Sequence, residues 1–167
     1  RPTATRVIYL DFVGKMLSGT AWNASTGGDC YAEPYDLDGT PAFSTAERLI
    51  VISVWRRVAE DFAPFDVDVT TENPGYAAIN RADLADSTFG TELLITNSTA
   101  NCPNGNTLYA TLCPASCGGL SYVGVFDDTG TNHDFYQPAI VFENGTNGTN
   151  GYPKYTRSEE HTSELQS

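Results

Sequence analysis

The sequence is poor in histidine, the side chain that most often binds zinc or acts as a general base. Among 167 residues there are two, His133 and His161. Neither has a second histidine at the helical spacing of an H-E-x-x-H zinc motif, and His161 lies in the context EEHTSE. His133 lies in a segment of Gly, Thr, Asn and Asp, which predicts an exposed loop position. A single usable imidazole supports no Ser-His-Asp or Cys-His hydrolase, so we expect neither a catalytic residue nor a metal ligand in this chain.

Basic side chains are also scarce. Nine lysines and arginines face 21 aspartates and glutamates, which gives a net charge of −12. This charge repels phosphate backbones, so we expect no nucleic acid partner. No apolar run approaches the roughly 18 residues of a membrane span, so we expect no membrane association. The 40% hydrophobic and 11% aromatic content, over about one domain's length, is typical of a packed globular domain.

The chain has four cysteines: Cys30, Cys102, Cys113 and Cys117. An even number at uneven spacing predicts two disulfides formed in an oxidising compartment, and three pairings are possible. The alternative is a zinc cluster, which needs closely paired cysteines, and only Cys113 and Cys117 have such a spacing. Four N-x-S/T sequons are candidate glycosylation sites: Asn23, Asn97, Asn144 and Asn147. Both features indicate a secreted, extracellular protein.

The last eleven residues, RSEEHTSELQS at 157–167, match the in-frame translation of a sequencing adapter. We therefore exclude them from the fold as a processing scar and expect the natural protein to continue differently. The alternative is a natural polar tail.

Hydrophobic patterning predicts one long helix and several strands. A capping box, Ser44 with Glu47, precedes a predicted helix over 45–62, which Pro64 ends. Strands are predicted at 6–12, 65–71, 92–96, 120–126 and 138–142. The other segments are predicted as a long surface connection at 14–43, a short helix at 77–86 and a cysteine-bearing loop at 97–116. A strand, a long helix and a strand in succession predict a parallel pair joined by a crossover, and hence an α/β fold.

Five segments in this order carry a resemblance to a known family: VIYLDF at 7–12, YDLDG at 35–39, FSTAERLIVISVWRRVAEDFAPFDVDVTT at 43–71, GGLSYVGVF at 118–126 and PAIVFEN at 138–144. They resemble the N-terminal half of reprolysin-like metalloproteases, which belong to the metzincins. The similarity covers nearly all of 6–156, and the block at 43–71 is its most specific part. One departure is Val13, where the family often has the second aspartate of L-D-F-D-G.

The resemblance implies an α+β fold: a twisted, mixed five-stranded sheet with a long helix packed on it, incomplete at the C-terminus. It implies that residues 1–156 are part of a metalloprotease catalytic domain. The helix that would bind zinc, which carries H-E-x-x-H-x-x-G-x-x-H in this family, would then lie beyond residue 156. The full-length parent would then hydrolyse peptide or protein substrates with a zinc-activated water, as a monomer. We expect the present chain to bind no zinc and to be inactive.

In metzincins the fourth strand is the antiparallel edge strand, to which an extended peptide adds by main-chain hydrogen bonds. By resemblance, the substrate-binding residues are Gly119, Leu120, Ser121, Tyr122, Val123 and Gly124. The alternative is an edge strand with a glycine bulge and no ligand. A second functional hypothesis is a secreted, non-catalytic binding or adhesion domain on the same scaffold.

Calcium is the remaining metal hypothesis. Asp36-x-Asp38-Gly39 has the start of an EF-hand loop but lacks its third acidic position and terminal glutamate. We interpret this segment as a solvated turn, and Asp127-Asp128 in the same way. A third hypothesis, a small calcium-dependent structural module, rests on these turns.

Overall fold

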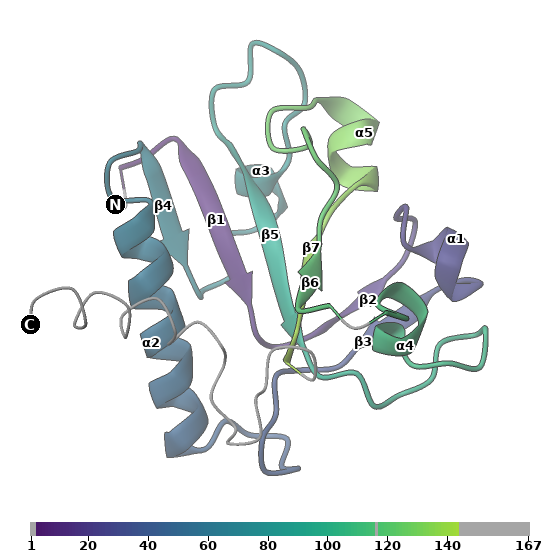
Figure 1. Cartoon of the computed structure of the whole chain (residues 1–167). Coiled ribbons are helices and arrows are strands. Elements are labelled where there is room, and N and C mark those ends of the chain that lie inside the picture. Colours follow the sequence, from purple (N-terminus) through teal and green to yellow (C-terminus); the bar gives the residue numbers. More distant parts are fainter. Residues whose placement is uncertain (1–2, 116, 144–167) are drawn as a thin grey trace, which may run out of the picture.

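The computed structural model describes residues 3–115 and 117–143, which fold around one five-stranded sheet (Figure 1). Its strands are β1 (Arg6–Asp11), β4 (Val67–Thr70), β5 (Phe89–Thr96), β6 (Gly119–Leu120) and β7 (Ala139–Phe142). Their order is β4-β1-β5-β7-β6; the β6–β7 pairing is antiparallel and the other three are parallel. The predicted mixed five-stranded sheet and α+β class are confirmed. Asn144, Asn147, His161 and the tail 157–167 lie outside the described residues.

The first strand pairs in parallel with β4 through a crossover that contains α2 (Thr45–Asp61), as predicted. The predicted capping box fixes the start of this helix. The Ser44 hydroxyl accepts from the Glu47 amide at 3.3 Å, and a Glu47 carboxylate oxygen accepts from the Ser44 amide at 2.7 Å. The helix ends one residue before its predicted end because Phe62 already leaves helical geometry, with ψ near 3°.

Two hydrophobic cores lie on opposite faces of the sheet. Helix α2 covers the first core with the apolar residues that recur along one of its faces: Ile50, Val54 and Val58. Successive strand residues point to opposite faces, so β5 sends Ile95 to this core and Leu94 to the other. In Figure 1, α2 lies beside β4 and β1, whereas α1, α4 and the β2–β3 hairpin lie toward the other edge of the sheet, near β6.

The prediction of a long surface connection without regular structure over 14–43 is wrong for residues 15–32. This segment forms a hairpin of β2 (Lys15–Leu17) and β3 (Cys30–Ala32), with α1 (Asn23–Thr26) between them. It supplies Leu17 and Trp22 to the second core, which also contains Leu94. Elements of three or four residues are too short to show a hydrophobic period, which explains why the sequence did not reveal them.

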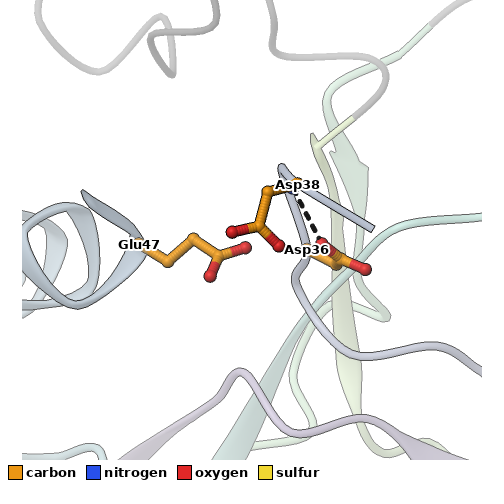
Figure 2. Close-up of side chains that lie close together, drawn as sticks. All are labelled: Asp36, Asp38 and Glu47. Carbon is orange, nitrogen blue, oxygen red and sulfur yellow. Dashed lines mark hydrogen bonds between the residues drawn. The ribbon is translucent and has the colours of Figure 1, made fainter. Parts of the chain in front are cut away.

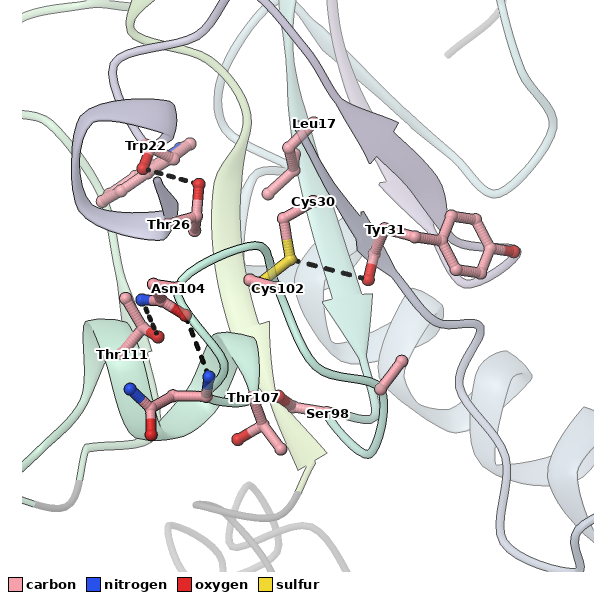
Figure 3. Close-up of a disulfide and its surroundings, with 12 residues drawn as sticks. Leu17, Trp22, Thr26, Cys30, Tyr31, Ser98, Cys102, Asn104, Thr107 and Thr111 are labelled. Carbon is pink, nitrogen blue, oxygen red and sulfur yellow. Dashed lines mark hydrogen bonds between the residues drawn. A yellow bond between two sulfur atoms is a disulfide. The ribbon is translucent and has the colours of Figure 1, made fainter. Parts of the chain in front are cut away.

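Both predicted disulfides are present, and the zinc-cluster alternative is therefore wrong. Cys30 pairs with Cys102, and Cys113 pairs with Cys117. Figure 3 shows the Cys30–Cys102 bond beside Leu17, where it joins β3 to the loop that follows β5. This bond spans 72 residues of sequence and fastens the hairpin to the main sheet.

Three further helices are short: α3 (Tyr76–Ile79), α4 (Leu108–Leu112) and α5 (Gly130–Phe135). The first is the helix predicted over 77–86, reduced to about one turn; α4 lies inside the predicted loop at 97–116, and α5 was not predicted. Strand β5 begins at Phe89, three residues before its predicted start, because Phe89 and Gly90 pair with β1. No helix in the described ranges is both long and apolar enough to span a bilayer.

Replacing Cys30 and Cys102 together with serine should lower the free energy of unfolding by about 4 kcal/mol, because the cross-link closes a separation of 72 residues. The same change at Cys113 and Cys117 should cost about 2 kcal/mol, since the separation there is 4. Urea titration under non-reducing conditions measures both losses. Equal losses for the two double variants would contradict this ranking.

Candidate functional site

The predicted substrate rim lies at the edge of the sheet, but its strand is short. Gly119 and Leu120 form β6, which pairs with β7. The strand predicted over 120–126 is wrong beyond Leu120, because the chain turns at Val123 and Gly124. Gly124 has a φ of 79°, a backbone angle that residues other than glycine adopt only at an energetic cost. This angle ends the extended conformation of the strand. Val123 is 99% exposed at this turn. Peptide binding by residues 119–124 stays a prediction.

The pairing of β6 decides which of its main-chain groups face outward. The Phe142 amide donates to the Gly118 carbonyl at 2.9 Å, and the register pairs Gly119 with Val141. Hydrogen-bonded and non-hydrogen-bonded pairs alternate in an antiparallel ladder. Gly119 is therefore in a non-hydrogen-bonded pair, and its N–H and C=O point away from β7 toward the free edge. A Cβ at position 119 would meet the Ile140 carbonyl oxygen at 2.6 Å, so glycine is required here.

Four aromatic rings form a continuous row that begins two residues beyond β6. We call this set the aromatic row: Trp22, Tyr122, Tyr136 and Phe135. Successive ring centroids are 4.7, 4.9 and 5.1 Å apart. The Trp22 ring is buried and donates its N–H to the Pro138 carbonyl, whereas Tyr122 and Phe135 are 39% and 43% exposed. Of these four residues, the sequence pattern pointed only to Tyr122, because the rings come from three separate segments and no local pattern links them.

His133 is fully buried in α5, so the prediction of an exposed loop residue is wrong. Its Nδ1 lies 3.2 Å from the Val125 carbonyl oxygen, and its Nε2 lies 2.9 Å from that of Ile79. The Gln137 side-chain nitrogen lies 2.7 Å from His133 Nε2, and the Gln137 oxygen accepts from the Glu92 amide of β5 at 2.9 Å. A six-residue helix with no apolar period leaves no signal for this burial in the sequence.

The contacts engage both nitrogens of the His133 ring. The Glu92 backbone amide is a donor, so the Gln137 oxygen must face it, and the Gln137 NH₂ then lies toward His133 Nε2. His133 Nε2 also lies against the Ile79 carbonyl, and Nδ1 lies against the Val125 carbonyl. Because both ring nitrogens are engaged within the protein, His133 does not fit a zinc ligand. It ties the segment after β6 to α5 and, through Gln137, to β5.

A partly buried polar cluster joins the β2–β3 hairpin to the sheet. Lys15 of β2 donates to Glu92 of β5 at 2.6 Å. Burial raises the pKa of the Glu92 carboxyl, Lys15 opposes this rise, and Asp11 adds to it. Burial also raises the pKa of Tyr9, with Asp11 and Glu92 contributing. The Lys15–Glu92 ion pair therefore joins the hairpin to the central strand.

Asp36, Asp38 and Glu47 bring carboxylate oxygens within 4.8 Å of one another (Figure 2). Asp36 accepts from the amides of Asp38 and Gly39, which makes the turn expected for this segment. Glu47 is buried, and it accepts from the Leu37 amide at 2.7 Å as well as from Ser44. The cluster thus joins a turn to the N-terminus of α2, where negative charge is favourable.

A pocket of about 540 Å³ opens beside this turn, and Tyr35, Phe43 and Asn97 are among its lining residues. The Tyr35 hydroxyl is buried without a hydrogen-bond partner among the described residues. Burial, followed by the charges of Glu143 and Glu47, raises the pKa of Tyr35 to about 12. No histidine or cysteine is among the described lining residues, so the pocket offers no base or nucleophile of those types.

Two predicted glycosylation sites, Asn23 and Asn97, lie within the described residues. Asn23 Nδ2 donates to the Leu17 and Gly28 carbonyls at 2.9 and 2.8 Å. A glycan on this nitrogen replaces one of its two hydrogens and so removes one of these bonds. Asn97 Nδ2 donates to the Asp36 carbonyl. Glycosylation of either residue stays a prediction.

No protein-family model matches the chain, and no curated protein or solved structure matches it either. Family membership therefore stays a prediction that rests on the resemblance of the five segments.

Replacing His133 with leucine should leave the Val125 carbonyl and the Gln137 amide unpaired, at a cost of about 3 kcal/mol in the free energy of unfolding. His133→Gln keeps a donor and an acceptor and should lose less. Urea titration measures the stability, and amide hydrogen exchange of residues 121–126 reports whether the segment after β6 loosens. A loss below roughly 0.5 kcal/mol for His133→Leu would contradict this linking role.

The hydrogen bonds from Leu37 and Ser44 hold the pKa of Glu47 below its ordinary value of 4.5. A carboxylate with a lowered folded pKa stabilises the fold above its unfolded pKa, and this stabilisation is lost as the pH falls through the folded pKa. Glu47→Gln should therefore melt lower at neutral pH and lose less stability on acidification below 4.5. Thermal melts across this range measure the effect, with Glu60→Gln on the exposed face of α2 as the control. Parallel pH profiles for Glu47→Gln and the unaltered chain would refute it.

Proposed function

We propose that this chain is the N-terminal, peptide-aligning part of the catalytic domain of a secreted zinc metalloendopeptidase of the reprolysin-like metzincin type. The observation that carries the proposal is the position of β6. It is the fourth strand of the main sheet in chain order, it is antiparallel and it forms an edge, as the resemblance implies for the substrate strand. The packing of α2 on the sheet, between the first two of these strands in the chain, supports the same family.

The chain's own part in this function is to bind and orient an extended peptide. The outward N–H and C=O of Gly119 can donate to and accept from one peptide residue, which adds a strand to the sheet. The turn at Val123 and Gly124 ends the edge, so the main-chain ladder is short. Side-chain contacts must therefore contribute to affinity, and the exposed rings of the aromatic row are the nearest apolar surface along the chain.

The zinc ion of such an enzyme does not fit the described residues. Both ring nitrogens of His133 are engaged, and the four cysteines form disulfides. We therefore assign no catalytic step to this chain and expect it to hydrolyse no peptide by itself. The zinc ligands of the proposed parent would come from residues that this sequence does not contain.

Other properties support an extracellular setting for the proposed enzyme. Two disulfides are typical of proteins that fold in an oxidising compartment. The net charge of −12 favours peptide or protein partners over nucleic acid. We propose that the complete domain acts as a monomer.

A secreted binding or adhesion domain is the second candidate. One observation favours it. The described residues bring together a free strand edge and aromatic rings, both of which can bind a peptide, but they include no histidine that is free to act as a base. Both candidates use the same edge, so they differ in chemistry and not in peptide recognition.

The coding sequence that follows Thr156 in the gene separates the two candidates. We expect an H-E-x-x-H motif within roughly twenty residues, on a helix. A continuation without two histidines one helical turn apart would overturn the protease assignment and leave the binding domain.

Peptide addition to β6 can be tested on the chain as it stands. A fluorescent peptide of alternating valine and threonine should bind roughly fivefold to tenfold more tightly than a twin with N-methylated alternate amides, which cannot donate to the edge. Gly119→Ala should weaken binding because its Cβ meets the Ile140 carbonyl. Gly39→Ala is the control for backbone strain away from the edge: its Cβ would meet nothing within 4 Å, but its φ of 75° disfavours any side chain. Equal fluorescence anisotropy titrations for the two peptides would exclude strand addition.

A further inference from the structure

The aromatic row continues from the free edge of β6. Tyr122 follows Gly119 by three residues, so the two Cα atoms are at most roughly 11 Å apart. The Tyr122 ring contacts both Trp22 and Tyr136, which hold it in place. An extended peptide paired with Gly119 advances about 3.3 Å per residue, so a side chain a few residues away can reach these rings.

Apart from Trp22, this surface comes from a part of the chain that has no basic side chain. Between Arg81 and Lys154 the sequence contains neither lysine nor arginine, and this stretch includes β5, β6, β7, α4 and α5. Three aspartates lie between Tyr122 and Phe135 in sequence: Asp127, Asp128 and Asp134. The Asp134 carboxylate also accepts from the Tyr76 hydroxyl at 2.6 Å. Arg81 reaches this region from outside, but its guanidinium already donates to the Asp127 carbonyl and lies over the Phe89 ring. The segment from Tyr122 to Tyr136, which follows the edge, therefore combines aromatic and acidic residues.

An arginine side chain suits both properties. Its guanidinium is planar, stacks on aromatic faces and carries a charge that neighbouring carboxylates attract. The same chain already uses this contact elsewhere, since Arg6 and Arg81 lie over the Phe89 ring at 4.0 and 4.2 Å from its centroid. In the aromatic row, Tyr122 and Phe135 leave ring surface exposed.

We infer that the β6 edge and the aromatic row together select extended peptides that carry arginine, with the guanidinium stacked on Tyr122 or Phe135 and its charge attracted by the neighbouring aspartates. The inference rests on the proposed peptide binding at β6 and adds the substrate class, which is arginine-bearing, cationic segments. It involves no covalent step.

The test uses the full disulfide-bonded chain and two fluorescent peptides of the same sequence, one with two arginines and one with citrulline in their place. Citrulline keeps the length and the hydrogen-bonding shape but has no charge. We expect the arginine peptide to bind roughly threefold to tenfold more tightly, with a smaller preference at high salt. Tyr122→Leu combined with Phe135→Leu should reduce the preference to less than about twofold. Tyr31→Leu, an exposed ring on the hairpin outside the row, should leave the preference unchanged.

The possible results separate a failure of the inference from a failure of the proposed function on which it rests. Equal binding of both peptides, or a preference that survives in the double variant with an unchanged circular dichroism spectrum, overturns the inference and leaves strand addition intact. If neither peptide binds, and the N-methylated twin also behaves like its parent, both the inference and the proposed function fail. Tyr122→Phe keeps the ring and should retain the preference. This result would show that the double variant does not lose the preference merely because residue 122 was changed.

Discussion

Strand β5 pairs with β1 on one side and with β7 on the other, and its alternate residues enter both hydrophobic cores. The position of every other layer depends on this register. Ile95 faces α2, whereas Leu94 faces the hairpin and its disulfide. A shift of one residue would exchange these faces and bury the wrong side chains, so the parallel pairing of β5 is the constraint on which the candidate site depends. Strand β7 takes its place from β5, and the edge strand β6 takes its place from β7.

The segment beyond β6 is held by polar links and not by a ladder. His133 joins the Val125 carbonyl to Gln137, and Gln137 in turn accepts from the Glu92 amide of β5. Buried polar groups are costly unless each has a partner, and here both nitrogens of His133 and both polar atoms of the Gln137 side chain have one. The turn after β6 can therefore expose Val123 while its far end stays anchored.

The two halves of the molecule differ in charge. Basic side chains lie in the N-terminal half, up to Arg81, and the half that carries β5, β6 and β7 has only acidic ones as far as Lys154. The exposed rings of Tyr122 and Phe135 lie in the acidic half. The proposed ligand chemistry follows from three features of this half: the outward main-chain groups of β6, the exposed aromatic rings and the excess of acidic residues.

Local sequence was sufficient for the elements whose signals lie within a few residues. The Ser44–Glu47 capping box placed the start of α2, and alternating or continuous apolar runs placed β1, β4 and β7 to within about two residues. Cysteine number predicted two disulfides, but their pairing depended on which loops the fold brings together. The hairpin over β2 and β3, the burial of His133 and the aromatic row were decided by the tertiary structure alone. Each depends on contacts between residues far apart in the chain, such as Cys30 with Cys102 or Trp22 with Tyr122, and such contacts leave no periodic pattern in the sequence.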